Sequence, residues 1–80
     1  MTRITLTHKG LTCDHVAMTR EEYMTNKDER KQMTREATVV LLRDEDFEDG
    51  LDAEYPLVAN ALKAAGVDTS KVYALFQFDK

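Results

Sequence analysis

The chain has 80 residues, of which 42% are hydrophobic and 32% are charged, and its formal net charge is −4. This length excludes two independently folded units, so we expect a single domain spanning residues 1–80. The negative charge argues against nucleic acid or an anionic membrane as a direct ligand, because phosphate binding depends on clustered Lys and Arg side chains.

Cys13 is the only cysteine, so the chain cannot form an internal disulfide. Small secreted domains usually compensate for thin cores with several disulfides, and a chain without them is typical of the cytoplasm. No stretch has the apolar length of a signal peptide or of a membrane-spanning helix. We therefore expect a soluble cytoplasmic protein, located in the host cytoplasm if a phage encodes it.

The first predicted element is a strand from Arg3 to His8, because Ile4 and Leu6 alternate there with polar residues. Lys9-Gly10 ends this strand. Residues 12–36 are rich in helix-forming residues, which favours a helix.

Within that stretch, the sequence Thr19-Arg20-Glu21-Glu22 fits a capping box. The alternative for residues 12–36 is a hairpin that turns near residues 26–29. It places Met24 opposite Met33 and Val16 opposite Leu41, which are chemically sensible cross-strand pairs. Both interpretations stay open from the sequence.

The second half of the chain predicts a strand, a loop, a helix and a final strand. The continuous apolar run from Ala37 to Arg43 indicates a central strand buried on both faces. Pro56 suits the first turn of a helix, whose apolar face comprises Leu57, Val58, Ala61, Leu62 and Ala65. Gly66 stands where a left-handed helix cap is expected. Ser70 to Phe78 is the last predicted strand.

These elements predict an α+β fold, a small two-layer sandwich. Its sheet has three or four strands, with one or two helices packed on one face. The element order β-α-β-α-β is favoured, and β-β-β-α-β is the alternative. The last two strands are either parallel neighbours joined by a right-handed crossover or antiparallel with a strand between them.

The most distinctive chemical feature is the acidic segment, which we define as residues 44–54. It contains seven acidic residues and no basic residue, whereas the rest of the chain is slightly positive. We expect an exposed electronegative patch that binds a basic surface, with Phe47 and Leu51 as candidate apolar anchors. The candidate partner-binding residues are Asp44, Glu45, Asp46, Phe47, Glu48, Asp49, Asp52 and Glu54. The alternative is a solvated loop whose carboxylates favour the dipole of the following helix.

Metal and cofactor sites find little support in the sequence. In the acidic segment, neither alignment with a calcium loop places both the glycine and the final acid correctly. His8, Cys13, Asp14 and His15 form a second cluster, in which thiolate and imidazole are zinc ligands. Their spacing matches no paired-ligand pattern, so we predict no metal site and no cofactor. A small metal-binding module using His8, Cys13 and His15 is kept as an alternative.

No constellation of residues supports catalysis, so the chain is not expected to be an enzyme. In type, a short, acidic, cysteine-poor domain of this kind resembles phage-encoded inhibitors, including anti-CRISPR proteins and nucleic-acid mimics, although no motif carries the resemblance. We predict a non-enzymatic inhibitor or adaptor that docks onto a larger protein such as a nucleic-acid enzyme. The further alternative is a homodimeric assembly subunit that extends a sheet through the exposed side of the strand 70–78.

Overall fold

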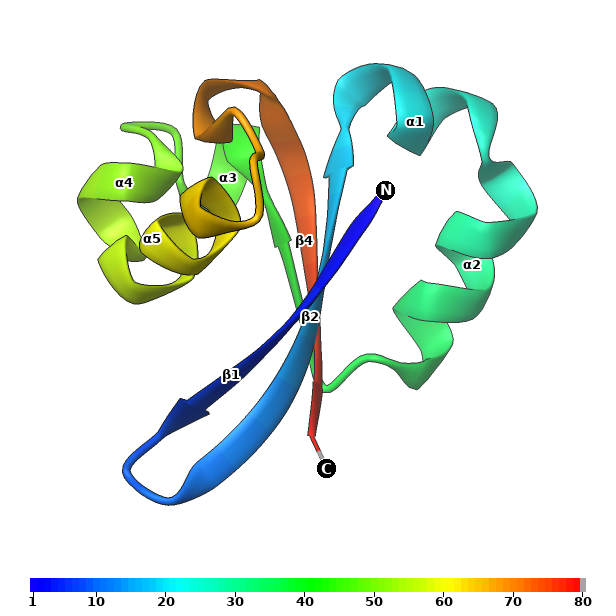
Figure 1. Cartoon of the computed structure of the whole chain (residues 1–80). Helices are drawn as coiled ribbons and strands as arrows, with labels where there is room; N and C mark the ends of the chain where they lie inside the picture. The colour runs from blue at the N-terminus through cyan, green and yellow to red at the C-terminus, as the bar shows by residue number, and fades with distance from the viewer. Residues whose placement is uncertain (80) are drawn as a thin grey trace.

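The computed structural model describes residues 1–79 as a four-stranded antiparallel sheet with helices on both faces (Figure 1). The strands, which lie in the order β1-β2-β4-β3, are β1 (Thr2–His8), β2 (Leu11–Thr19), β3 (Val39–Leu42) and β4 (Val72–Asp79). The helices are α1 (Arg20–Thr25), α2 (Lys27–Glu36), α3 (Arg43–Asp46), α4 (Leu51–Glu54) and α5 (Pro56–Ala64), with a 3-10 turn η1 (Thr69–Lys71). The predicted α+β class is confirmed.

The strands β1 and β2 form a hairpin with a two-residue turn. The pairing runs from Thr2 opposite Ala17 to His8 opposite Leu11. Lys9 and Gly10 both have positive φ angles, of 52° and 78°. A turn with two positive φ angles twists in the same sense as the strands that it joins. The predicted end of the first strand at Lys9-Gly10 is therefore confirmed.

The prediction of a continuous helix over residues 12–36 is wrong for its first part. Residues 12–19 belong to β2, and only residues 20–25 and 27–36 are helical. Four successive side chains, from His15 to Met18, are buried. Both faces of β2 are therefore covered, and this burial together with pairing to two neighbouring strands outweighs local helix propensity.

The capping box marks the true start of the helical region. The Thr19 hydroxyl accepts a hydrogen bond from the Glu22 amide at 3.2 Å, and the Glu22 carboxylate accepts one from the Thr19 amide at 2.9 Å. The alternative hairpin with its turn near residues 26–29 is also wrong. Val16 lies opposite Phe76 rather than Leu41.

The strand predicted to be central, over residues 37–43, is an edge strand. Its ordered part, β3, pairs only with β4. Val40 and Leu42 contact the α1–α2 side and Leu41 contacts the α5 side, but all three are only partly buried. Apolar side chains on both faces are thus compatible with an edge position, because helices cover both faces of the sheet.

The last strand, β4, lies at the centre of the sheet between β2 and β3. The predicted parallel crossover is wrong, as is a strand inserted between β3 and β4, because these two strands are antiparallel neighbours. The sheet-extension surface expected on residues 70–78 is also absent, since both edges of β4 are paired. A register shift next to Thr19 places Val72 on the α5 side and Tyr73 on the α1 side, the reverse of simple alternation.

Apolar side chains form two clusters, one on each face of the sheet. One cluster joins Ala17 and Leu75 to residues from α4 and α5, and the other joins Val16 and Phe76 to side chains of α1 and α2. Figure 1 shows α1 and α2 on one side of the sheet and α3, α4 and α5 on the other. The expectation of helices on one face is therefore wrong. The order β-β-α-β-α-β, with each helical region counted once, matches neither predicted order completely.

Candidate binding surface

The acidic segment folds as two short helices rather than as a loop. Its first helix, α3, begins directly after β3, and the Asp46 carboxylate accepts a hydrogen bond from the Leu42 amide at 2.8 Å. Gly50 then adopts a φ angle of 104°, in a region that favours glycine, and allows the chain to turn into α4. The segment therefore has regular helical structure on both sides of the turn at Gly50.

Phe47 and Leu51 do not serve as exposed anchors, because both are buried in the core. Phe47 is 0% exposed and Leu51 is 1% exposed. The Phe47 ring meets Tyr55 edge to face, with 6.5 Å between the ring centroids. Positions 47, 51 and 55 are spaced four residues apart and all contact the same cluster. These apolar residues fix the acidic segment to the body of the protein, so Phe47 is a structural residue rather than a contact for a partner.

The carboxylates of the segment all point away from the core. Exposure is common to all seven acidic residues, which are Asp44, Glu45, Asp46, Glu48, Asp49, Asp52 and Glu54. Of these seven residues, only Asp52 forms an ion pair within residues 1–79, with Lys63. The other six acidic residues of the segment therefore keep their negative charge without a basic partner.

Asp52 is used inside the protein. The Lys63 ammonium and the Thr69 hydroxyl both donate to its carboxylate, and the Thr69 hydrogen bond measures 2.6 Å. These two interactions lower the pKa of Asp52, the Lys63 contact most. Arg43, directly before the segment, donates instead to the Thr69 carbonyl at 3.3 Å. The interactions of Asp52 and Arg43 thus meet at Thr69, and within residues 1–79 no side-chain hydrogen bond or ion pair engages Glu45, Glu48 or Glu54.

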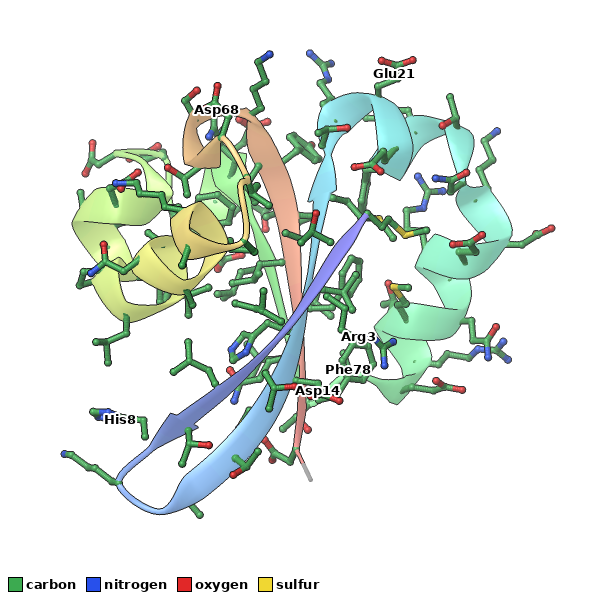
Figure 2. The ribbon with its side chains drawn as sticks, viewed as in Figure 1. Arg3, His8, Asp14, Glu21, Asp68 and Phe78 are labelled. Carbon is green, nitrogen blue, oxygen red and sulfur yellow. The ribbon has the colours of Figure 1, made fainter. Side chains whose placement is uncertain are left out.

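The second predicted cluster is only partly brought together: His8, Cys13 and His15 line one pocket on the α5 side, but Asp14 does not. Asp14 lies on the α2 side of the sheet, where its carboxylate accepts a hydrogen bond from Thr5 at 2.8 Å, whereas His8 lies on the other side (Figure 2). The Cys13 thiol donates to Asp79 at 3.3 Å, an interaction that raises the pKa of Cys13. No group of three His, Cys, Asp or Glu side chains within residues 1–79 is arranged to hold a metal ion. The geometry gives the metal-binding alternative no support.

The structure also contains an apolar pocket that the sequence did not reveal. It has a volume of about 270 Å³ and lies between the β1–β2 hairpin and α5. Leu57, expected on the buried face of its helix, is 52% exposed at this pocket, whereas the buried residues of α5 are Ala59 and Leu62. The helix α5 carries more apolar residues than one face of a short helix can bury. This excess was the only sign of the pocket in the sequence.

Searches of protein-family models, of curated proteins and of solved structures find no match. In residues 1–79, every helix is too short or too polar to cross a membrane. Inference about function therefore rests on the two surfaces described above.

Proposed function

We propose that this protein is a non-enzymatic binding protein that docks its acidic segment onto a basic surface of a larger protein, as an inhibitor or adaptor. The observation that carries the proposal is the exposure of all seven carboxylates on a segment that Phe47 and Leu51 attach to the core. A rigid support lowers the entropy lost on binding, because the charges are already arranged before the partner arrives.

The charge distribution supports this function. Six of the seven carboxylates have no ion-pair partner within residues 1–79, and Arg43, the basic residue directly before the segment, is turned toward Thr69. A dense group of like charges attracts an oppositely charged surface and raises the rate of encounter. Because the partner must be basic, a nucleic-acid enzyme is a suitable class: its groove is built to bind phosphates.

The proposal is tested with two variants that each remove four negative charges. The first neutralises the segment by Glu45→Gln, Glu48→Gln, Asp49→Asn and Glu54→Gln. The matched control neutralises exposed acids of α1 and α2 by Glu21→Gln, Asp28→Asn, Glu29→Gln and Glu36→Gln. Within residues 1–79, none of the four segment side chains makes a hydrogen bond or an ion pair that would be lost, so both variants should fold.

The measurement is affinity capture from lysate over a salt series, with identification of the retained proteins by mass spectrometry. We expect a basic protein to bind the wild type and the control variant, and to bind the segment variant about tenfold more weakly at 0.05 M salt. Binding of the wild type and of the control variant should also weaken as the salt concentration rises toward 0.5 M, because salt screens the charges. Equal capture by both variants, or capture indifferent to salt, would refute the proposal.

A further inference from the structure

The strand β1 forms one edge of the sheet, and its outer side is uncovered. Within residues 1–79, β1 pairs only with β2. Figure 1 looks onto this edge: β1 lies in front of the other strands, and no helix or loop crosses it. An edge strand presents a row of backbone amides and carbonyls that can pair with another strand. The strand β1 therefore offers a surface to which a further strand can be added.

The hairpin geometry identifies the backbone groups of β1 that face outward. His8 and Leu11 flank a two-residue turn, so this pair exchanges both of its hydrogen bonds. Hydrogen-bonded and non-hydrogen-bonded pairs alternate along an antiparallel ladder. Arg3, Thr5 and Thr7 therefore direct their amides and carbonyls away from β2, toward the open edge.

The side chains of β1 do not protect this edge. Many edge strands carry charged side chains that keep other strands away. Arg3 is the only Lys, Arg, Asp or Glu residue of β1, and its guanidinium lies 5.9 Å from the centre of the Phe78 ring on β4. Thr5 donates a hydrogen bond to Asp14 on β2. These side chains thus interact with their own sheet, and the backbone of the edge stays accessible.

The opposite edge of the sheet, β3, is protected. The Leu42 amide donates to the Asp46 carboxylate at 2.8 Å, so it is already paired within the chain. The strand β3 has only four residues, and α3 follows it directly with Asp44, Glu45 and Asp46. A second copy joined at β3 would bring these like charges together, which is unfavourable. Of the two edges, β1 is therefore the one suited to self-association.

The sequence of β1 is symmetric in character about Thr5. The apolar residues Ile4 and Leu6 flank it, and the polar residues Arg3 and Thr7 follow on either side. A two-fold interface requires such a self-complementary surface. If Thr5 lies opposite Thr5 of a second copy, Arg3 lies opposite Thr7, so every outward-facing residue finds a partner. Ile4 then lies opposite Leu6 of the second copy, and such apolar cross-strand pairs stabilise a sheet.

Exposed apolar side chains gather on the same face, next to this edge. Ile4 and Leu6 both contact the cluster on the α5 side. Leu6 also lines the apolar pocket together with Leu11 and Leu57, which are 72% and 52% exposed. Exposed apolar residues that lie together mark an interaction surface more strongly than scattered ones. A second copy at β1 would add its Ile4 beside this group.

We propose that the chain forms a two-fold symmetric homodimer through antiparallel pairing of β1 with β1 of a second copy, centred on Thr5. The two sheets then form one continuous sheet with β3 at both outer edges. This inference goes beyond the docking of the acidic segment, whose first helix follows β3 at the opposite edge. Dimerisation and docking therefore stand or fall in separate experiments.

The first test is sedimentation equilibrium of the whole chain between about 5 and 500 μM. We expect the mass to approach twice the monomer mass of 9.2 kDa as the concentration rises. Hydrogen exchange followed by NMR should slow with concentration at the amides of Arg3, Thr5 and Thr7, because only these amides of the strand gain a bond in the dimer. A mass of 9.2 kDa over the whole range overturns the inference.

Two variants at position 5 test the role of the backbone. Thr5→Pro removes an outward-facing amide but none that pairs with β2, so the hairpin keeps its ladder. Each copy loses one hydrogen bond to the other, and we expect the dimer to weaken at least about tenfold. Thr5→Ala also loses the contact with Asp14 but keeps the amide, so it should dimerise within about twofold of the wild type. Equal dimerisation of the two variants overturns the inference.

Two variants at position 7 test the register, and they decide the question if Thr5→Pro does not fold. Thr7 lies opposite Arg3 of the second copy, twice in each dimer. Thr7→Glu should therefore tighten the dimer about threefold and Thr7→Lys should weaken it about threefold. The net charge of −4 alone predicts the reverse order, because added positive charge reduces repulsion between two acidic copies. Equal effects, or the reverse order, overturn the inference.

Discussion

The two faces of the sheet are covered in different ways. On the α5 side, four helix or turn residues between positions 47 and 62 are buried, namely Phe47, Leu51, Ala59 and Leu62. On the other side, the buried residues of the cluster all come from strands, and α1 and α2 contribute none. Both faces of the sheet are therefore buried, but helix side chains are fully buried only on the α5 side, whereas α1 and α2 contribute only partly buried residues.

The difference indicates two sources of helix stability. The helices α3 and α4 have four residues each, which is far too short to be stable alone, so burial of Phe47 and Leu51 holds them in place. The ten-residue α2 is rich in helix-forming residues and contacts the sheet through half-buried side chains such as Met33. Burial of apolar side chains is the main source of helix stability on the α5 side. On the α2 side, the main source is local helix propensity together with polar contacts.

The largest effect should come from a core residue of the α5 side. Phe47→Ala removes a fully buried ring and its contact with Tyr55, and we expect a loss of about 3–5 kcal/mol in the free energy of unfolding. Met33→Ala, on the half-buried α2, should cost only about 1 kcal/mol. Urea denaturation measures both. Similar losses for the two variants would show that the faces are equally important to stability.

A smaller effect is expected where a polar side chain joins α1 to α2. The Arg30 guanidinium lies 4.8 Å from the centre of the Tyr23 ring and donates to the Tyr23 carbonyl at 3.1 Å. Arg30→Ala should lower the free energy of unfolding by about 1–1.5 kcal/mol. Arg35→Ala, which removes an exposed arginine from the same helix, should change it by less than about 0.5 kcal/mol. An equal loss for both variants would argue against the contact with Tyr23.

The next prediction concerns the capping box at Thr19, where α1 begins. Thr19→Ala removes the hydroxyl that accepts a hydrogen bond from the Glu22 amide. We expect a loss of about 1 kcal/mol in the free energy of unfolding. Thr19→Ser keeps the hydroxyl and should retain most of the stability. Denaturation followed by circular dichroism checks the pair. If serine is as damaging as alanine, the methyl group of Thr19, and not its hydrogen bond, supports this end of α1.

The smallest expected effect is a pH dependence of the free energy of unfolding, which comes from His15 on the α5 side. Burial lowers the pKa of His15 below its ordinary value of 6.5, so the unfolded chain binds a proton more readily than the folded one. Stability should therefore fall as the pH decreases through 6.5 toward 5.5. His15→Phe should flatten this dependence, while His8→Gln, at an exposed position, should retain it. Urea midpoints at pH 7.5, 6.5 and 5.5 provide the measurement, and a steeper fall in His15→Phe would contradict the assignment.

Part of the fold could be predicted because local signals were sufficient. Alternation of apolar residues identified β1, and the pairing of Pro56 with Gly66 identified the ends of α5. Gly66 has a φ angle of 84°, and the amides of Gly66 and Val67 donate to Lys63 and Leu62, as expected for a left-handed cap. The capping box at Thr19 also carried the correct information, since a capping box marks where a helix starts and a strand can end.

The candidate surface was only half predictable. Charge identified the acidic segment, and its carboxylates are exposed. Phe47 and Leu51 were predicted to be exposed apolar anchors for a partner and proved to be buried, because an isolated apolar residue in a polar run can point either way. The apolar pocket depends on Leu11 and Leu57, which lie 46 positions apart in the chain, and no local pattern brings such residues together.

The sequence by itself determined the α+β class, the positions of β1, β3, α5 and β4, and the concentration of negative charge in one segment, because propensity, capping and charge are local properties. Tertiary structure alone decided that β4 is central, that β3 lies at the edge and that helices cover both faces. It also decided which apolar residues are buried and which remain exposed at the pocket. The physical reason is that burial is shared between distant residues: each side chain competes with all others for a limited interior, and only the complete packing settles the outcome.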